Sequence, residues 1–275
     1  MKNNCTVLYA KNIGDVIYHS RTASNLVVCG ACTQIEELPD TTLILRNIDE
    51  LKQIICRERY VEVGSAVTLT KILELGEKRI PLVLFQAISS TAVPLVRNVA
   101  TIGGNICAHG IKRTLFAPLL ALEAKLEIRN HYEIKVIPIS QFNEIPSGYF
   151  LTKIRVPFEE WDLQIFKRVG PSFTIDNSSA SYTFLANTKK DLLSELHIAF
   201  CGLVRFRSRE LENVLIGAKL PLSDKEIINM LDEASKYFDE QAIISDLCDD
   251  FTDEDVKILK VKFLNLLKYS LEQLT

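Results

Sequence analysis

A run of twelve residues with two adjacent glycines is the segment of this sequence best suited to chemistry. It covers residues 96–107, reads VRNVATIGGNIC, and places Gly103 and Gly104 near its end. Because glycine lacks a Cβ, the backbone can turn through positive φ and approach a ligand closely, and successive N–H groups in such a turn form a concave anion site. Thr101 and Asn105 flank the pair with groups that suit phosphate or ribose oxygens. The run predicts a pyrophosphate site, although a plain tight turn also explains two glycines.

Elements on both sides of this segment must hold it in place. Their apolar and β-branched runs predict strands at residues 5–9, 26–29, 42–46, 60–64, 125–129, 134–137 and 149–156. Asn47 followed three residues later by Glu50 has the form of a helix cap, so residues 48–56 are expected to be helical. Helices are also predicted at residues 69–78, 81–89 and 118–123.

The order of elements changes after Pro157. Three long strands are predicted at residues 163–168, 180–187 and 196–206, and two helices follow from the capping boxes at Ser223 and Thr252. We therefore place a boundary at residues 159–162. The expected fold class is α+β, with an N-terminal domain at 1–160 in two lobes (about 1–55 and 56–160). A smaller C-terminal domain follows at 161–275, with an antiparallel sheet and terminal helices.

Composition excludes several classes of protein. The chain has 275 residues, 47% hydrophobic and 24% charged, with a formal net charge of −3, which is typical of a globular protein. No basic stripe is present, so nucleic acid binding is not expected. The N-terminus lacks the organisation of a signal peptide, and no apolar window could span a membrane. We expect a cytoplasmic protein.

The cysteines and histidines leave one question open. Seven scattered cysteines fit reduced thiols. Cys29 and Cys32 form a Cys-x-x-Cys pair that is either a dithiol couple, half of a metal site, or a coincidence within a loop. No second such pair exists and the four histidines share no metal-ligand spacing, so no metal site is predicted. Coincidence is the reading we prefer from sequence.

The twelve-residue run resembles the FAD-binding signature of the flavoprotein subunits of molybdenum hydroxylases. These are the medium subunits of xanthine, carbon monoxide and nicotinate dehydrogenases. The resemblance covers nearly the whole chain. Residues 27–34 (VVCGACTQ) stand where the family has its second phosphate-binding turn, and the later segments that resemble it are residues 118–124, 149–157, 166–168 and 207–217.

The resemblance implies a two-lobed FAD-binding domain of the PCMH/vanillyl-alcohol-oxidase type and a set of cofactor-binding residues. From the front turn these are Val28, Cys29, Gly30, Ala31, Cys32, Thr33 and Gln34. From the main motif they are Thr101, Gly103, Gly104, Asn105 and Ala108. Leu151 would pack on the isoalloxazine ring and Lys167 would reach the polar edge of the flavin. Without the resemblance, these two are equally well a buried strand residue and a solvated lysine.

Three departures from the family pattern bear on the flavin site. Ala31 stands at a usual glycine position of the front turn, and Ala92 with Val93 replaces a glycine-led turn before the main motif. The aspartate that usually follows the motif is missing, since residues 108–114 read AHGIKRT. Lys112 and Arg113 could supply contacts in its place.

The function implied by the resemblance is electron transfer. FAD would collect electrons from iron–sulfur clusters and pass a hydride to NAD⁺ or another acceptor, without catalytic residues from the protein. The chain has neither a cluster motif nor room for a molybdopterin domain, so the expected partners are a molybdopterin-binding large subunit and a [2Fe-2S] small subunit in a hetero-oligomer. Two alternatives stay open: a scaffold subunit without tight FAD binding, and a free-standing FAD oxidoreductase.

Overall fold

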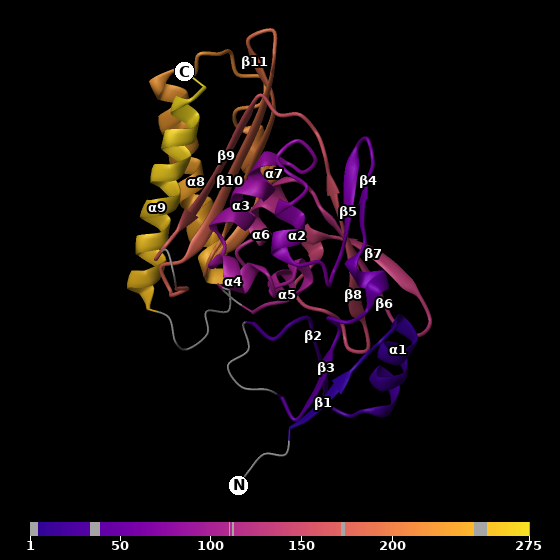
Figure 1. The fold of residues 1–275 in the computed structure, drawn as a ribbon. Coiled ribbons are helices and arrows are strands. Elements are labelled where there is room, and N and C mark those ends of the chain that lie inside the picture. Colours follow the sequence, from indigo (N-terminus) through magenta and orange to yellow (C-terminus); the bar gives the residue numbers. More distant parts are fainter. Residues whose placement is uncertain are drawn as a thin grey trace. The chain divides into compact units, whose positions relative to one another are not determined.

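The computed structural model describes residues 5–33, 39–109, 111, 113–171, 174–244 and 252–274 (Figure 1). The chain divides into two compact units that are not continuous in sequence. The first consists of Met1–Pro81, Thr91–Ala108 and Glu123–Phe158, and the second of Leu82–Ser90, His109–Leu122 and Glu159–Thr275. Two short stretches from the N-terminal half therefore belong to the second unit.

A small parallel sheet begins the first unit. Its strand order is β1-β3-β2, with β1 at Thr6–Tyr9, β2 at Leu26–Cys29 and β3 at Thr41–Ile44. Helix α1 (Ile13–Thr22), which the sequence did not predict, begins where the Asn12 side chain accepts a hydrogen bond from the Asp15 N–H. Its Val16 is fully buried in a core with Leu43. Burying that face stabilises a helix whose own sequence pattern is weak.

An antiparallel sheet of five strands forms the rest of the first unit. Its order is β4-β5-β8-β6-β7, with the bounds Ile54–Cys56, Tyr60–Gly64, Phe150–Pro157, Lys125–Arg129 and Ile134–Pro138. The hairpin between β6 and β7 turns at Asn130, whose side-chain oxygen accepts from the Tyr132 and Glu133 N–H groups at 2.7 and 2.8 Å. The prediction of paired strands around this turn is confirmed.

The predicted helix over residues 48–56 is wrong. The segment is a short 3-10 helix, η1 (Asp49–Lys52), followed by strand β4, and Ile48 rather than Asn47 stands at the cap position. The carbonyls of Leu51 and Gln53 accept from the Ala66 and Gly64 N–H groups at 2.9 and 2.8 Å. Pairing with the next strand, β5, therefore decides the structure of this segment, and local helix capping does not.

Short helices connect the strands of the first unit. Helix α2 (Leu69–Leu73) is shorter than predicted because the chain turns at Gly76, which has a φ of +79°. Helix α4 (Pro94–Arg97) is followed by α5 (Ile102–Ile106), and the 3-10 helix η3 (Ile139–Gln141) follows β7. The turn before α4 is left-handed at Ala92, with a φ of +53°. Its geometry is that of a glycine-led turn although the residue is alanine.

The second unit is built around a four-stranded antiparallel sheet. Its order is β12-β11-β10-β9, with the bounds Arg205–Arg207, Leu192–Cys201, Ala180–Lys189 and Leu163–Val169. The predicted strand at 196–206 is therefore two strands, because the chain reverses at Gly202, whose N–H bonds the Val204 carbonyl. The helices of this unit are α3 (Leu82–Ser90), α6 (Phe116–Ala121), α7 (Arg209–Asn213), α8 (Asp224–Ile244) and α9 (Asp253–Glu272).

Helices cover both faces of this sheet. On one face Tyr182 of β10 donates a hydrogen bond to Ser270 of α9 at 3.1 Å, and both side chains are fully buried. On the other face His197 of β11 contacts the carbonyl of Ala121 in α6 at 2.6 Å, and burial lowers the pKa of the imidazole. Alternating side chains of the central strands therefore serve two helical layers. The capping box predicted at Thr252 is confirmed.

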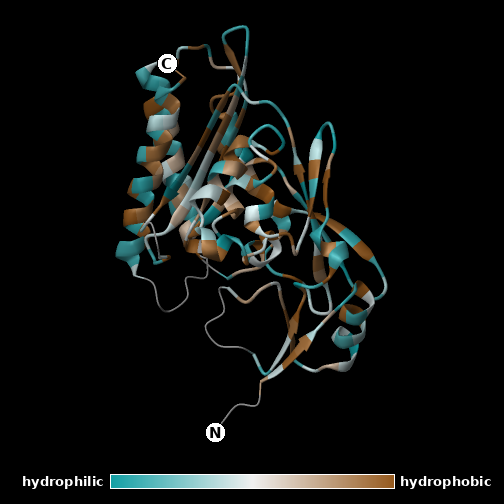
Figure 2. Cartoon of the chain, viewed as in Figure 1, coloured by the Kyte–Doolittle hydropathy of each residue, from teal (hydrophilic) through white to brown (hydrophobic). Residues whose placement is uncertain are grey.

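Hydropathy follows the same arrangement. Helices α8 and α9 carry alternating hydrophobic and hydrophilic bands, as expected for helices with one buried face (Figure 2). Within the described part of the chain, no helix combines the length and apolar character that crossing a membrane requires.

We predict that Ala92→Gly stabilises the protein. The Ala92 side chain is exposed and its backbone is left-handed, a conformation in which a Cβ is strained. Removing the Cβ should raise the free energy of unfolding by about 0.5–1 kcal/mol, after allowing for the greater freedom of unfolded glycine. Denaturant titration measures this change.

Ala23→Gly is the matched control, since Ala23 has a φ of −98°. It should leave stability unchanged or lower it. Equal effects of the two substitutions would contradict the strain at Ala92.

Candidate functional site

The glycine-containing run forms the start of helix α5, and this helix end is closed by the protein itself. The Thr101 hydroxyl accepts from the Gly104 N–H at 3.0 Å, and its carbonyl accepts from the Asn105 N–H at 3.0 Å. The N–H groups of Ile102 and Gly103 donate to the carbonyls of Val67 and Ser65 at 3.1 and 3.0 Å. The first backbone donors of α5 are therefore engaged before any ligand arrives.

The role of the two glycines differs from the sequence prediction. Neither Gly103 nor Gly104 has a positive φ, so the expected left-handed turn is wrong. Gly103 is required by space instead, because a Cβ there would lie 2.6 Å from the Ser65 carbonyl oxygen and 2.8 Å from the Ser65 Cβ. The missing side chain lets α5 lie directly against the segment after β5.

The front turn rests on the cap of α5. This turn consists of residues 29–33 and begins at the last residue of β2. A Cβ on Gly30 would lie 2.5 Å from the Thr101 hydroxyl oxygen. Only glycine allows this approach, so the two segments that the sequence singled out for phosphate binding are brought together at Gly30 and Thr101.

The front turn is left-handed at Cys32, with a φ of +57°, and not at Ala31. The alanine at a usual glycine position therefore fits without backbone strain. Among the described residues, no acceptor is recorded for the backbone N–H groups of Ala31, Cys32 and Thr33. Consecutive free donors around a left-handed residue suit an anion. Gln34, also predicted to bind the cofactor, lies outside the described residues.

A buried hydroxyl without a partner lies beside this junction. Ser65 is 5% exposed, and its Oγ has no hydrogen-bond partner in the described structure. Sequence reasoning missed this residue because a serine between a strand and a helix has no distinctive signal. An unsatisfied buried hydroxyl costs about 1–3 kcal/mol unless a ligand or water pairs with it.

A β-bulge positions Leu151. The register between β6 and β8 shifts at Glu127 and Ile128, where Thr152 donates to the Glu127 carbonyl and carboxylate at 3.0 and 2.6 Å. Thr152 also accepts from the Ser65 N–H at 2.9 Å, which connects the bulge to the segment beneath α5. Leu151 is 4% exposed on β8, and its contact with a flavin ring stays a prediction.

Two cationic residues named from the sequence lie in the second unit. Lys167 is exposed on β9 with its Nζ 5.7 Å from the centre of the Tyr269 ring. Arg113 is buried with its guanidinium 5.6 Å from the centre of the Phe116 ring. Lys112, named as a possible substitute for the missing aspartate, lies outside the described residues. Flavin contacts of Lys167 and Arg113 stay predictions.

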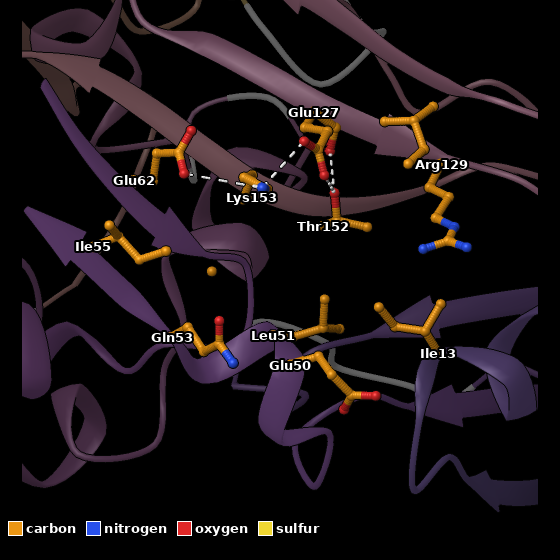
Figure 3. Close-up of a pocket in the computed structure, with 12 residues that line it drawn as sticks. Ile13, Glu50, Leu51, Gln53, Ile55, Glu62, Glu127, Arg129, Thr152 and Lys153 are labelled. Carbon is orange, nitrogen blue, oxygen red and sulfur yellow. Dashed lines mark hydrogen bonds and ion pairs between the residues drawn. The ribbon is translucent and has the colours of Figure 1, made fainter. Parts of the chain in front are cut away.

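A separate polar pocket of about 280 Å³ lies within the first unit (Figure 3). Lys153 stands on one wall between Glu127 and Glu62, with its Nζ 3.3 and 4.0 Å from their carboxylates. Glu50, Leu51 and Gln53 form the opposite wall. None of the predicted cofactor-binding residues lines this pocket, and its volume is small for a dinucleotide.

We predict that Gly103→Ala destabilises the protein by about 1–3 kcal/mol, the usual effect of overpacking a close contact. The new Cβ would press on the backbone of Ser65, which cannot move without breaking its bond to Thr152. Chemical denaturation measures the change in the free energy of unfolding.

Gly104→Ala serves as the comparison, because its Cβ would meet only the Thr101 hydroxyl at 3.0 Å. We expect a smaller loss from this variant. A Gly103→Ala protein as stable as the wild type would disprove the close packing of α5.

Comparison with known proteins identifies relatives of this chain in sequence and in fold. Residues 21–159, just over half of the chain, match the family model described as the FAD binding domain in molybdopterin dehydrogenase. The xanthine dehydrogenase FAD-binding subunit of Escherichia coli O157:H7 is 36% identical over 105 residues, which are 37% of this chain and 36% of that protein. The matched region thus spans about a third of the length of this relative.

Solved structures show the fold over nearly the whole chain. A chain of the Cu,Mo-containing CO dehydrogenase in its cyanide-inactivated form superposes with a TM-score of 0.83 at 15% identity, covering 98% of this chain and 97% of that one. Carbon monoxide dehydrogenase from Hydrogenophaga pseudoflava gives a TM-score of 0.82 at 16% identity with the same coverage. Together with the family match, these findings show that the chain belongs to the FAD binding domain family of the molybdopterin dehydrogenases.

Proposed function

We propose that this chain binds FAD and serves as the electron-transfer subunit of a molybdenum-containing dehydrogenase. The observation that carries the proposal is the junction of the front turn with the cap of α5. Gly30 lies against Thr101, while the N–H groups of Ala31, Cys32 and Thr33 have no acceptor among the described residues. This arrangement offers backbone N–H donors to a pyrophosphate, next to the capped start of α5.

The residues at the junction fit the cofactor in two respects. A Cβ at Gly30 would collide with the Thr101 hydroxyl, so this position of the turn needs glycine. Glycine is also the usual residue where a backbone lies close to a ligand. The Ser65 hydroxyl is buried beside α5 and has no hydrogen-bond partner among the described residues. A buried hydroxyl of this kind is expected to bond to a ligand oxygen or nitrogen when the ligand binds. Gly103 and Gly104 would act mainly by supporting the turn, because their N–H groups already donate to Ser65 and Thr101. Thr101 would support it as the acceptor that caps α5.

Bound FAD would supply the ability to accept single electrons and release them in pairs as a hydride. The chain would hold the pyrophosphate at the front turn. The bulge at Thr152 would fix Leu151, the residue proposed to pack on the ring, and Lys167 would lie at its polar edge. No acid or base from the protein is needed for hydride transfer itself.

The proposed assembly includes two further chains, a molybdopterin-binding large subunit and a [2Fe-2S] small subunit. The Escherichia coli relative is itself described as a subunit, which supports a heteromeric complex. Helix α4 and its cap present three neighbouring apolar side chains to solvent, with Leu95 79% exposed and Val93 and Val96 40% and 37% exposed. Such a group is common where a partner chain packs.

The proposed acceptor is NAD⁺. This choice rests on the resemblance to the molybdenum hydroxylase flavoproteins, whose flavin passes a hydride to NAD⁺ or another acceptor. If NAD⁺ is the acceptor, NADH added without oxygen should bleach the long-wavelength absorption band of the bound flavin. An unchanged band would point to another acceptor while leaving FAD binding intact.

We predict that the purified chain takes up stoichiometric FAD and perturbs its visible absorption bands. Gly30→Ala should weaken binding roughly tenfold or more, about 1.4 kcal/mol, because the new Cβ forces the front turn off Thr101. Titration of FAD absorbance or fluorescence measures both affinities.

Gly14→Ala in α1 is the control, since its Cβ would meet only the Asn12 side chain and it lies outside the front turn. It should bind FAD like the wild type. A chain that takes up no FAD would support the scaffold alternative, and an unaffected Gly30→Ala variant would move the flavin away from this junction.

A further inference from the structure

The proposed function assigns no role to the thiols of the two cysteines in the front turn. Cys29 ends β2 and is 6% exposed, whereas Cys32 is partly exposed at the left-handed position of the turn. Both are free thiols at the two ends of one Cys-Gly-Ala-Cys turn, near enough for Cys32 to raise the pKa of the Cys29 thiol. The structure thus places both thiols in the turn whose backbone N–H groups have no acceptor among the described residues.

The described part of the chain offers no further metal ligands beside this pair. Among the described residues, no group of three or more histidine, cysteine, aspartate or glutamate side chains is placed to hold an ion. Two thiols supply half of a tetrahedral site at most. Of the three interpretations that the sequence left open, the placement of both thiols in one left-handed turn favours the dithiol.

We propose that Cys29 and Cys32 form a redox-active pair whose oxidation to an intramolecular disulfide reshapes the front turn and weakens FAD binding. The coupling to FAD rests on the proposed function, whereas formation of the disulfide does not. The oxidant that we assign is a small disulfide such as oxidised glutathione.

The exchange proceeds in two balanced steps. The partly exposed Cys32 loses its proton to water, and its thiolate attacks one sulfur of the small disulfide, releasing one thiolate and forming a mixed disulfide. Cys29 then attacks the Cys32 sulfur as its own proton leaves, and the second small thiolate departs and is protonated. Two protein thiols are oxidised, one small disulfide is reduced to two thiols, and no other electron carrier is involved.

Cys32 is assigned the first attack because of its surroundings. Burial, and to a smaller extent the neighbouring Cys32, raises the pKa of the Cys29 thiol to about 12, so Cys29 stays protonated near neutral pH. Access also favours Cys32, since the Cys29 side chain is covered. Cys29 therefore acts as the resolving thiol.

Oxidation must move the turn. An S–S bond is about 2.05 Å long, shorter than any non-bonded contact between two thiols, so the two sulfur atoms have to approach. The intervening Gly30 cannot shift toward α5, because the Thr101 hydroxyl already occupies the space that a Cβ would need. The strain falls on Ala31 and Cys32, whose N–H groups are the proposed pyrophosphate donors.

The effect is reciprocal by thermodynamic linkage. If the disulfide lowers FAD affinity by a given factor, saturating FAD makes the dithiol harder to oxidise by the same factor. A tenfold loss of affinity corresponds to a rise of about 30 mV in the midpoint potential of the pair.

The test equilibrates the full chain in a series of reduced and oxidised glutathione mixtures, with and without saturating FAD. Cleavage after Arg21 and Arg46 releases a peptide of residues 22–46 that contains these two cysteines and no other. We expect a species lighter by two hydrogens, a midpoint potential that FAD raises, and FAD affinity at least tenfold weaker in the oxidised protein.

Cysteine variants separate the pair from other thiols. Cys56→Ser removes an exposed thiol of β4 in the same unit and should keep the redox dependence of FAD binding. Cys29→Ser and Cys32→Ser should each bind FAD equally well under oxidising and reducing conditions. Dependence that persists in either variant would assign it to a different cysteine and overturn the proposal.

Three further results would each overturn a part of the proposal. A peptide that keeps both thiols, or carries glutathione on Cys32 alone, overturns the redox pair. A disulfide that leaves FAD affinity unchanged overturns the coupling. A reduced protein that takes up no FAD at all overturns the proposed function together with the coupling, and the peptide masses then judge the disulfide separately.

Discussion

The structure around the proposed cofactor site depends on one side chain, Thr101. Its hydroxyl caps α5 through the Gly104 N–H, and the same oxygen lies in the space above Gly30 where a Cβ would fall. One threonine thereby fixes the start of a helix and the position of a turn far away in sequence. A cap of this kind contributes about 1 kcal/mol to stability, but its effect on the geometry of the turn matters more for binding.

In this arrangement the start of α5 supports the proposed site, and the front turn offers the backbone donors for the ligand. The glycine motif is the more distinctive sequence, yet its backbone donors bond to Val67, Ser65 and Thr101 within the protein. The less regular front turn keeps its donors free among the described residues. A turn that offers N–H donors and is held against the capped start of α5 is well suited to a charged ligand, because little reorganisation is needed on binding.

The sequence predicted the elements whose signals are local. Most strands of both units and the capping box at Thr252 follow from alternation and cap residues over a few positions. The helix expected at 48–56 fails because the carbonyls of Leu51 and Gln53 accept from Ala66 and Gly64 at the end of the next strand, a pairing that the capping pattern does not reveal. For the same reason, the inclusion of α3 and α6 in the second unit could not be read from the chain order.

The candidate site was predicted in its parts but not in their relation. Gly103 was identified as a position that needs glycine, but the expected reason was a positive φ and the observed one is lack of space. Gly30 was named only as part of the front turn, and its close approach to Thr101 was not foreseen. The left-handed residue proved to be Cys32, a type that seldom adopts this conformation, and Ser65 gave no signal at all. Contacts between segments remote in sequence decide each of these points.

In the proposed site the front turn, and not the end of α5, supplies the donors to the pyrophosphate. Amide hydrogen exchange of the chain with and without FAD tests this assignment most directly. We expect FAD to slow exchange at Ala31, Cys32 and Thr33, while residues 102–105 already exchange slowly without it. Strong FAD-induced protection confined to residues 102–105, with the front turn unchanged, would contradict it.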